Sequence, residues 1–319
     1  MIVTITLNPA IDKTVEISDF EIGAVNRVYS MRVDAGGKGI NVSKVIKSLG
    51  GESKAVGIIG GTGGVFIKET LDRAGIKNDF HVINGETRTN LKIIDTSKKT
   101  NTDINEQGPL ITFEDMERVK QQALSGLKPG DIVVLSGSVP ANVDKSIYGM
   151  WISEAKKAGA KTILDADGDL LKHGVEAGPF LVKPNIHELR KLFGIELRTI
   201  SDIEKYGRSL MKKYGIEEVV VSLGPEGAVF IDKECSILGR NIEVEVKSTV
   251  GAGDAMVAAL AYSINRGCSL EETVALSMAT SNANVMTSGS QAADYETIAG
   301  LQKAVKFEYI VGKQEKNKN

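Results

Sequence analysis

Short apolar runs that alternate with amphipathic helical patterns are the feature that most limits what this chain can fold into. After a first strand-like run at 2–7, further runs at 55–59, 132–135, 162–164 and 219–222 are almost wholly apolar. Such runs are typical of strands buried on both faces of a parallel sheet. Helical periodicity fills the intervals, at 40–49, 65–74, 113–126, 146–158 and 203–214. We therefore predict an α/β fold with a mostly parallel central sheet.

Two segments depart from this alternation. Residues 13–33 and 88–105 carry strand-like alternation with many polar residues and no helix between the strands. Half-polar strands of this kind suit a small sheet with one face towards solvent. The two segments are either a pair of exposed hairpins or a lid over an active site, and the pattern alone favours neither.

Charge and composition exclude several classes of protein. The net charge of the 319 residues is −2 and no basic stripe alternates with aromatic residues, so a nucleic-acid partner is not expected. The two cysteines, Cys235 and Cys268, have no metal-ligand spacing and indicate a reducing compartment. No apolar run reaches the roughly 20 residues that span a bilayer, and no charged leader precedes an apolar stretch. We expect a cytoplasmic protein without a membrane partner, ending in a disordered basic tail at 312–319.

The segment Ser248-Thr249-Val250-Gly251-Ala252-Gly253-Asp254 carries the strongest chemical signal. It leads into a helical run, 255–265, that is closed by Gly267. The first amides of a helix have no partner within the helix, and with the helix dipole they form an anion site. Asp254 lies where a carboxylate could accept the proton of an attacking hydroxyl; with an ordinary pKa of about 3.9 it would be ionised at neutral pH. The alternative is a plain glycine-rich turn with Asp254 as a first-turn residue.

The segment Ala35-Gly36-Gly37-Lys38-Gly39-Ile40-Asn41 is the second signal. Glycine allows close backbone approach to a substrate, Lys38 offers a point charge, and the Asn41 amide can donate and accept. The spacing fits neither the dinucleotide fingerprint nor the phosphate loop of nucleotide triphosphatases. A loop into a helix with a solvated lysine is the alternative.

Two further segments are placed at strand ends. Lys183-Pro184-Asn185-Ile186-His187-Glu188 follows an apolar run and precedes a helix, which is where open α/β sheets bind ligands. Glu188 could act on hydrated Mg²⁺ or could simply be a favourable charge at a helix start. Ser222-Leu223-Gly224-Pro225-Glu226-Gly227 is either a hairpin or a loop that flanks a nucleotide.

Together and in this order, the four motifs resemble the ribokinase-like (PfkB) carbohydrate kinases over nearly the whole chain to about residue 311. The GGKGIN and STVGAGD segments are similar to the two most characteristic regions of that family. The stretches 6–12, 87–90 and 103–109 resemble its hexose-phosphate branch, closest to the members that phosphorylate fructose 1-phosphate. The resemblance implies a three-layer sandwich spanning 1–311, with a small β-sheet lid formed by about 13–33 and 88–108.

The resemblance also implies a role for individual residues. The catalytic group would be Asp254 as base with Gly251, Ala252 and Gly253 as the anion-binding turn. The sugar phosphate would be bound by Asp12, Gly37, Lys38, Asn41, Arg88 and Asn90, with Arg88 on the phosphate and with Arg27 reaching from a partner subunit. ATP would be bound by Lys183, Asn185, Ser222, Gly224, Gly227 and Asn282, with Glu188 acting on Mg²⁺ through water.

The function that the resemblance implies is ATP-dependent, Mg²⁺-dependent phosphorylation of a ketohexose phosphate, by a homodimer joined through the lid. Fructose 1-phosphate is the expected acceptor, and tagatose 6-phosphate is the alternative. A non-catalytic sensor of sugar phosphates built on a kinase fold is the alternative of another class, although a sensor would not need the base Asp254.

Overall fold

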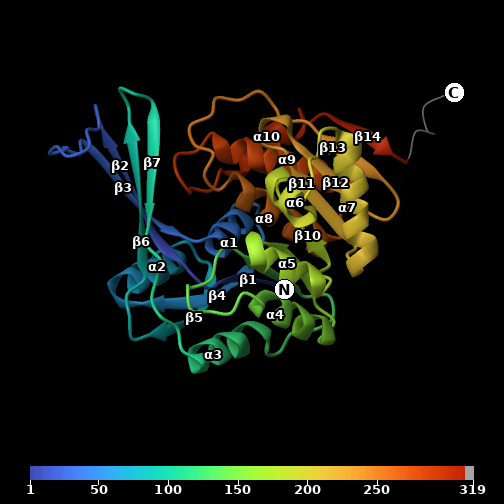
Figure 1. Ribbon diagram of the computed structural model, residues 1–319, viewed down its shortest axis with the longest axis horizontal. Coiled ribbons are helices and arrows are strands. Elements are labelled where there is room, and N and C mark those ends of the chain that lie inside the picture. The colour runs from blue at the N-terminus through green and yellow to red at the C-terminus, as the bar shows by residue number, and fades with distance from the viewer. Residues whose placement is uncertain (313–319) are drawn as a thin grey trace.

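Two β-sheets organise the computed structural model, which describes residues 1–312 (Figure 1). The large sheet has the strand order β14-β13-β12-β11-β10-β9-β8-β1-β4-β5. Its strands are β1 (Ile2–Thr6), β4 (Ser53–Gly60), β5 (Lys77–Ile83), β8 (Ile132–Ser136), β9 (Lys161–Asp165), β10 (Leu181–Val182), β11 (Glu218–Ser222), β12 (Ala228–Ile231), β13 (Ser236–Gly239) and β14 (Phe307–Val311). Except for Gly312, the tail expected at 312–319 lies outside the described residues.

The predicted mostly parallel sheet is confirmed. Neighbouring strands from β5 to β11 all pair in parallel, and the five runs predicted as strands correspond to β1, β4, β8, β9 and β11. At the other edge, β12, β13 and β14 continue the sheet by antiparallel pairing, and of these strands β13 and β14 were not predicted. The segment 222–227 does form a hairpin connection there, between β11 and β12.

The helices are α1 (Lys38–Ser48), α2 (Gly61–Arg73), α3 (Phe113–Leu124), α4 (Ile147–Lys157), α5 (Gly168–Glu176), α6 (Ile186–Phe193), α7 (Ile200–Tyr214), α8 (Ala252–Arg266), α9 (Leu270–Val285) and α10 (Tyr295–Gln302). The predicted helical intervals correspond to α1, α2, α3, α4, α7 and α8, and α6 follows the segment 183–188 as expected, whereas α5, α9 and α10 were not predicted. Several begin at side chains that accept a hydrogen bond from a free amide of the first turn, as Thr112 does for Asp115 and Ser269 for Glu272. None of the helices in residues 1–312 is long and apolar enough to cross a bilayer.

Helices cover both faces of the large sheet and make a three-layer structure. Alternate residues of β1 divide between two cores, Ile2 towards one and Val3 towards the other. The core on the Ile2 side is filled by α1, α8, α9 and α10, and the core on the Val3 side by α3, α4, α5 and α7. The fully buried Trp151 and Tyr148 of α4 are the largest side chains of the second core.

The small sheet stands beside the main body, on the left of Figure 1. Its strands, in the order β3-β2-β6-β7, are β3 (Ser30–Gly36), β2 (Ala10–Ile17), β6 (Arg88–Asp95) and β7 (Thr100–Asn105). Because β2 and β6 pair in parallel, the two half-polar segments form one sheet and not two separate hairpins. Polar side chains of β2 and β6, such as Asp12 and Asn90, line the central cavity, whereas Val15, Ile17 and Ile93 form a small apolar cluster of their own.

Candidate active site

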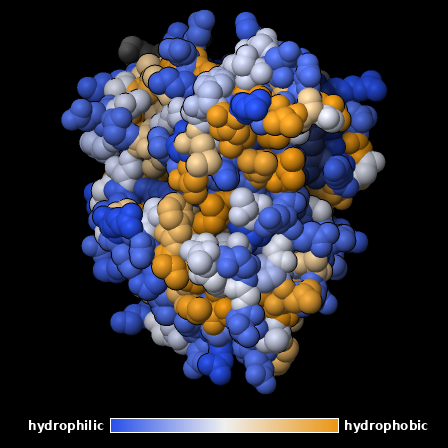
Figure 2. Space-filling model, turned by 90° about the vertical axis from the view of Figure 1, so that its left-hand side faces the viewer, coloured by the Kyte–Doolittle hydropathy of each residue, from blue (hydrophilic) through white to orange (hydrophobic). Residues whose placement is uncertain are grey.

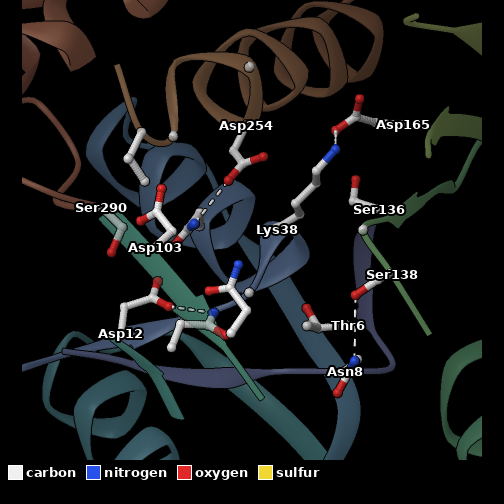
Figure 3. A pocket seen from close by; sticks show the side chains of 18 of the residues that line it. Thr6, Asn8, Asp12, Lys38, Asp103, Ser136, Ser138, Asp165, Asp254 and Ser290 are labelled. Carbon is white, nitrogen blue, oxygen red and sulfur yellow. Dashed lines mark hydrogen bonds and ion pairs between the residues drawn. The ribbon is translucent and has the colours of Figure 1, made fainter. Parts of the chain in front are cut away.

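One cavity of about 580 Å³ lies between the small sheet and the ends of the large-sheet strands. Its wall includes the last residues of β1, β8, β9 and β11, the first turns of α1 and α8, and the polar face of the small sheet. Figure 3 shows these side chains converging from several segments far apart in the sequence. Of the residues predicted for the site, the cavity gathers Asp12, Gly37, Lys38, Asn41, Arg88, Asn90, Lys183, Asn185, Glu188, Ser222, Gly251, Gly253 and Asp254.

The turn before α8 places Asp254 on the cavity wall. Gly251 caps the helix with a φ of 79°, a left-handed conformation that favours glycine. Asp254 is the third residue of α8 and is 7% exposed. A Cβ added to Gly253 would lie only 3.7 Å from the Lys183 Nζ, so the Lys183 ammonium is close to the start of the helix. The free amides of the first turn and the nearby cation make the turn a site for an anion.

The Asp254 carboxylate is more basic than an ordinary aspartate. Burial raises its pKa from 3.8 to about 6, against the opposing effect of Lys38 and of the hydrogen bond from Asn41. The Asn41 Nδ2 donates to the Asp254 Oδ2 at 2.9 Å (Figure 3). The expectation of an ordinary pKa near 3.9 is therefore wrong, because Asp254 is buried. A base whose pKa approaches the working pH accepts a proton in the transition state more effectively, while it is still mostly ionised at pH 7.

Lys38 and Lys183 share one buried carboxylate, Asp165. Asp165 ends β9, and its two oxygens lie 3.1 Å from the Lys38 Nζ and 3.0 Å from the Lys183 Nζ. Burial would raise the pKa of Asp165, but the two lysines outweigh it and hold the pKa below the ordinary value. In turn Asp165, against the effect of burial, raises the pKa of Lys38. The Lys38 ammonium thus points to the end of β9, as Figure 3 shows. The Lys183 ammonium lies beside the α8 turn, close to Gly253.

Asp12, Asn90 and Arg88 form the small-sheet wall. The Asn90 Nδ2 donates to the Asp12 Oδ1 at 2.9 Å. The Arg88 guanidinium donates to two backbone carbonyls, of Glu106 at 2.9 Å and of Asn8 at 3.2 Å, and its buried Nε has no partner. Burial raises the pKa of Asp12, an effect that Asn90, Lys44 and Arg88 oppose. The arginine is thus held in place and keeps a donor for a ligand.

Glycines let the two walls approach each other. A Cβ on Gly36 would meet the Asp12 carboxylate at 2.1 Å, and one on Gly37, whose φ is 120°, would meet the Thr6 Cγ2 at 2.6 Å. The glycines predicted for backbone approach to a substrate are therefore also required by the packing of β2 and β1 against the start of α1.

Asn185 and Glu188 cap α6 reciprocally. The Asn185 Oδ1 accepts from the amides of His187 and Glu188, both at 2.9 Å, and the Glu188 Oε2 accepts from the Asn185 amide at 2.7 Å. Both residues also line the cavity, and burial raises the pKa of Glu188. The helix-start interpretation is therefore correct, and it leaves the carboxylate facing the cavity. Within residues 1–312 no group of three acidic, histidine or cysteine side chains could hold a metal alone.

Five predicted residues lie outside the cavity wall. Ala252 is in the turn but does not line the cavity, and Arg27 is exposed in the loop between β2 and β3. Gly227 is required by the hairpin, because a Cβ there would meet the Gly239 carbonyl at 2.0 Å. Buried Asn282 donates to the Asn241 Oδ1 at 3.1 Å, and Asn241 in turn donates to the carbonyl of Gly224 at 2.9 Å. These contacts tie α9 to the loop after β11.

Buried polar atoms without partners mark cavity residues that include four not predicted as site residues, namely Thr6, Asn8, Ser136 and Ser290. Ten side chains in residues 1–312 have such an atom, and six of them line the cavity: Thr6, Asn8, Arg88, Asn90, Ser136 and Ser290. A buried polar group without a partner is costly, so its concentration here indicates a place where a polar ligand supplies the missing bonds. The position of Thr6 and Ser136 at the ends of apolar runs could have identified them, whereas no sequence signal pointed to Ser290.

Comparison with known proteins agrees with this geometry. A family model described as pfkB family carbohydrate kinase matches residues 2–298, a range that includes the whole cavity wall. The 1-phosphofructokinase of Bacillus subtilis is 36% identical over 287 residues, which cover 90% of this chain and 93% of the relative. The crystal structure of phosphofructokinase-2 from Escherichia coli in complex with fructose-6-phosphate superposes with a TM-score of 0.89 at 28% identity, covering 95% of this chain and 98% of that one. Ribokinase from Arabidopsis thaliana, complexed with ribose and ATP, has a TM-score of 0.75 at 27% identity over 95% of this chain and 98% of its own, which confirms the expected ribokinase-like fold.

Proposed function

The chain belongs to the pfkB family of carbohydrate kinases, and we propose that it phosphorylates fructose 1-phosphate with ATP to give fructose 1,6-bisphosphate. The observation that carries this proposal is the position of Asp254, a buried carboxylate in the first turn of a helix, in the same cavity as Arg88. The first is suited to accept a proton beside an anion site, and the second to bind a phosphate that the acceptor already carries.

The acceptor is proposed to lie along the small-sheet wall. The planar guanidinium of Arg88 matches phosphate oxygens in two places at once, which favours a phosphorylated sugar over a free one. The Asp12 carboxylate, held by Asn90, can accept from sugar hydroxyls. The acceptor hydroxyl would then face Asp254.

The chemical step is an in-line transfer. Asp254 takes the proton of the acceptor hydroxyl as the hydroxyl oxygen bonds to the γ-phosphorus of ATP, and the bond from that phosphorus to the bridging oxygen breaks. The bridging oxygen leaves with the electron pair as part of ADP. The first-turn amides of α8 and the Lys38 and Lys183 ammonium groups stabilise the charge on the transferring group, without movement at the moment of reaction.

ATP is proposed to lie along the large-sheet wall, near Lys183, Asn185 and Ser222, with the base towards the loop that Asn282 supports. Mg²⁺ bound to the nucleotide would neutralise phosphate charge, and the carboxylate of Glu188 is the cavity residue suited to hold its waters. The hydrogen bond between Glu188 and the Asn185 amide fixes the direction of that carboxylate.

Steady-state kinetics with three acceptors test the proposal. We expect the highest kcat/KM for fructose 1-phosphate, compared with fructose 6-phosphate and tagatose 6-phosphate, in an assay that couples ADP to NADH oxidation. A clear preference for tagatose 6-phosphate would replace the acceptor and keep the mechanism. Production of no ADP with any of the three would contradict the kinase assignment and support a sensor.

A homodimer joined through the small sheet is also proposed. The loop before β3 and the strand itself expose Val25, Val28, Tyr29 and Met31, each 47–82% accessible. Figure 2 shows apolar side chains gathered on the side of the molecule where this sheet lies. Covering them with a second copy would remove apolar area from water and could bring Arg27 of one subunit near the other. Light scattering of the wild type and of Met31→Glu would show a dimer that the charge disrupts. The cytoplasmic location expected from the sequence stays a prediction that fits the use of ATP.

A further inference from the structure

Ser290 places a buried hydroxyl on the cavity wall without a partner. The residue is 5% exposed, lines the cavity, and its Oγ makes no hydrogen bond within residues 1–312. It lies in the turn after α9, and its Cα is 4.0 Å from the position that a Cβ on Gly251 would take. The hydroxyl is therefore next to the α8 turn that carries Asp254. In Figure 3 the Ser290 side chain points to the space between the Asp254 helix and Asp12 of the small sheet.

The turn that carries Ser290 is held by the small sheet. A Cβ on Gly289, whose φ is 65°, would lie 1.7 Å from the Arg32 Nη2, so the guanidinium packs directly on the glycine backbone. Arg32 is in β3, and its Nε donates to the Asp34 Oδ2 at 2.7 Å. The position of Ser290 thus depends on a contact between the main body and the small sheet, a contact that any other residue than glycine at 289 would displace.

The local charge decides which part of a ligand belongs here. The Asp34 Oδ2 lies 3.3 Å from the position of a Cβ on Gly289, and Asp12 and Asp103 line the same side of the cavity. Arg32 pairs with Asp34 and Lys92 pairs with Asp103 at 3.3 Å, so this side carries no excess of positive charge for a phosphate, and its carboxylate oxygens can accept hydrogen bonds from neutral hydroxyls. The cationic side chains Arg88 and Lys38 are available for phosphate groups elsewhere on the wall.

We propose that Ser290 binds a hydroxyl of the acceptor sugar, and that Arg32 keeps it in position by supporting the turn at Gly289. This inference rests on the proposed function and adds a residue that neither the sequence motifs nor the comparisons indicate. Because the hydroxyl has no partner among the side chains and backbone of residues 1–312, the bound acceptor would supply its hydrogen bond.

A matched pair of serine variants tests the proposal. Ser290→Ala should raise the KM for fructose 1-phosphate about 3- to 10-fold, the effect of one neutral hydrogen bond, and leave the KM for ATP unchanged. Ser288 lies in the same turn but is exposed and does not line the cavity, so Ser288→Ala should behave as the wild type. An unchanged acceptor KM in Ser290→Ala would overturn the proposal.

Thermal unfolding separates binding from a purely structural role. Removal of a buried hydroxyl without a partner should leave the Tm of the free protein unchanged or higher, while the increase of Tm on adding fructose 1-phosphate becomes smaller. A lower Tm of the free Ser290→Ala protein with a normal fructose 1-phosphate response would assign the hydroxyl a structural role and contradict the inference.

A double-mutant cycle tests the part of Arg32. Arg32→Ala should raise the acceptor KM in the wild-type background and add little in the Ser290→Ala background, because both changes remove the same bond. Fully additive effects on the acceptor KM would show that Arg32 affects acceptor binding independently of Ser290. If the wild type prefers tagatose 6-phosphate, the proposed acceptor fails, and the same variants tested with that sugar still decide the role of Ser290.

Discussion

The two walls of the cavity differ in how far their polar groups are satisfied before any ligand binds. On the large-sheet wall, Asp165 pairs with two lysines and Asp254 accepts from Asn41, so each buried charge has a partner. On the opposite side, the Nε of Arg88, the Oδ1 of Asn90 and the Oγ of Ser290 are buried without one. The charged groups of the first wall are thus paired before any ligand binds, although the hydroxyls of Thr6 and Ser136 at the ends of β1 and β8 are not; the small-sheet side and the neighbouring turn at Ser290 lack hydrogen bonds that a ligand can supply.

This difference suggests that the two walls affect different steps, namely turnover and acceptor binding. Preorganised groups need no rearrangement as charge develops, so the large-sheet wall should determine turnover. Groups without partners gain their bonds when substrate binds, so the opposite wall should determine acceptor affinity. Changes on one wall should therefore alter kcat, and changes on the other should alter the acceptor KM. The predictions below test this separation, from the largest expected effect to the smallest.

The largest effect is expected for Asp254→Asn. Loss of the base should reduce kcat by roughly 10²- to 10⁴-fold, with little change in the acceptor KM. Burial raises the pKa of Asp254 to about 6, above its value in the unfolded chain. The ionised carboxylate therefore lowers the free energy of unfolding, and this effect is complete above about pH 6. The variant should consequently have a higher Tm than the wild type at pH 8, a difference that disappears below about pH 4. A lower Tm at pH 8 would instead attribute the lost activity to damaged folding.

Asp165→Asn tests whether the large-sheet wall depends on its shared carboxylate. The change leaves two ammonium groups near each other, with Lys183 only 5% exposed, and should cost on the order of 3 kcal/mol of unfolding free energy. Urea denaturation would measure the loss, and kcat should fall while the acceptor KM changes little. The exposed ion pair of Lys77 and Glu52 provides the control, because Glu52→Gln should change neither quantity measurably.

Arg88→Lys addresses the opposite wall. The change keeps the positive charge but removes the planar guanidinium that can donate to two phosphate oxygens. It should raise the KM for fructose 1-phosphate about 10- to 100-fold, with a smaller effect on kcat and none on the KM for ATP. Arg118→Lys, on the exposed face of α3, is the matched surface control. An equal rise in both Michaelis constants would remove the distinction between the walls.

The smallest effect is the pH dependence of the wild type. Because Asp254 in the free protein is half ionised at a pKa of about 6, kcat/KM should be roughly half its plateau at pH 6 and about a tenth of it at pH 5. A constant kcat/KM from pH 5 to 8 would show that no group on the large-sheet wall titrates in the free protein with an effect on the reaction.

The sequence predicted the scaffold and the chemical centre better than the walls themselves. Buried strands and the glycine turn before Asp254 are local patterns, so the parallel sheet and α8 could be read directly. The pairing of Lys38 with Asp165 joins residues 127 positions apart, and no periodicity indicates such a contact. The raised pKa of Asp254 depends on the same tertiary packing. Ser290 has no motif, because its role comes from burial without a partner and from the fold that surrounds it.

The most direct test of the division of work is to measure kcat and both Michaelis constants for Asp254→Asn and Arg88→Lys side by side, with fructose 1-phosphate and ATP. The two-wall account predicts that the first variant loses turnover with a nearly normal acceptor KM, and that the second loses acceptor affinity while it retains most of its turnover. Near-normal turnover in Asp254→Asn, or the same pattern of loss in both variants, would contradict it.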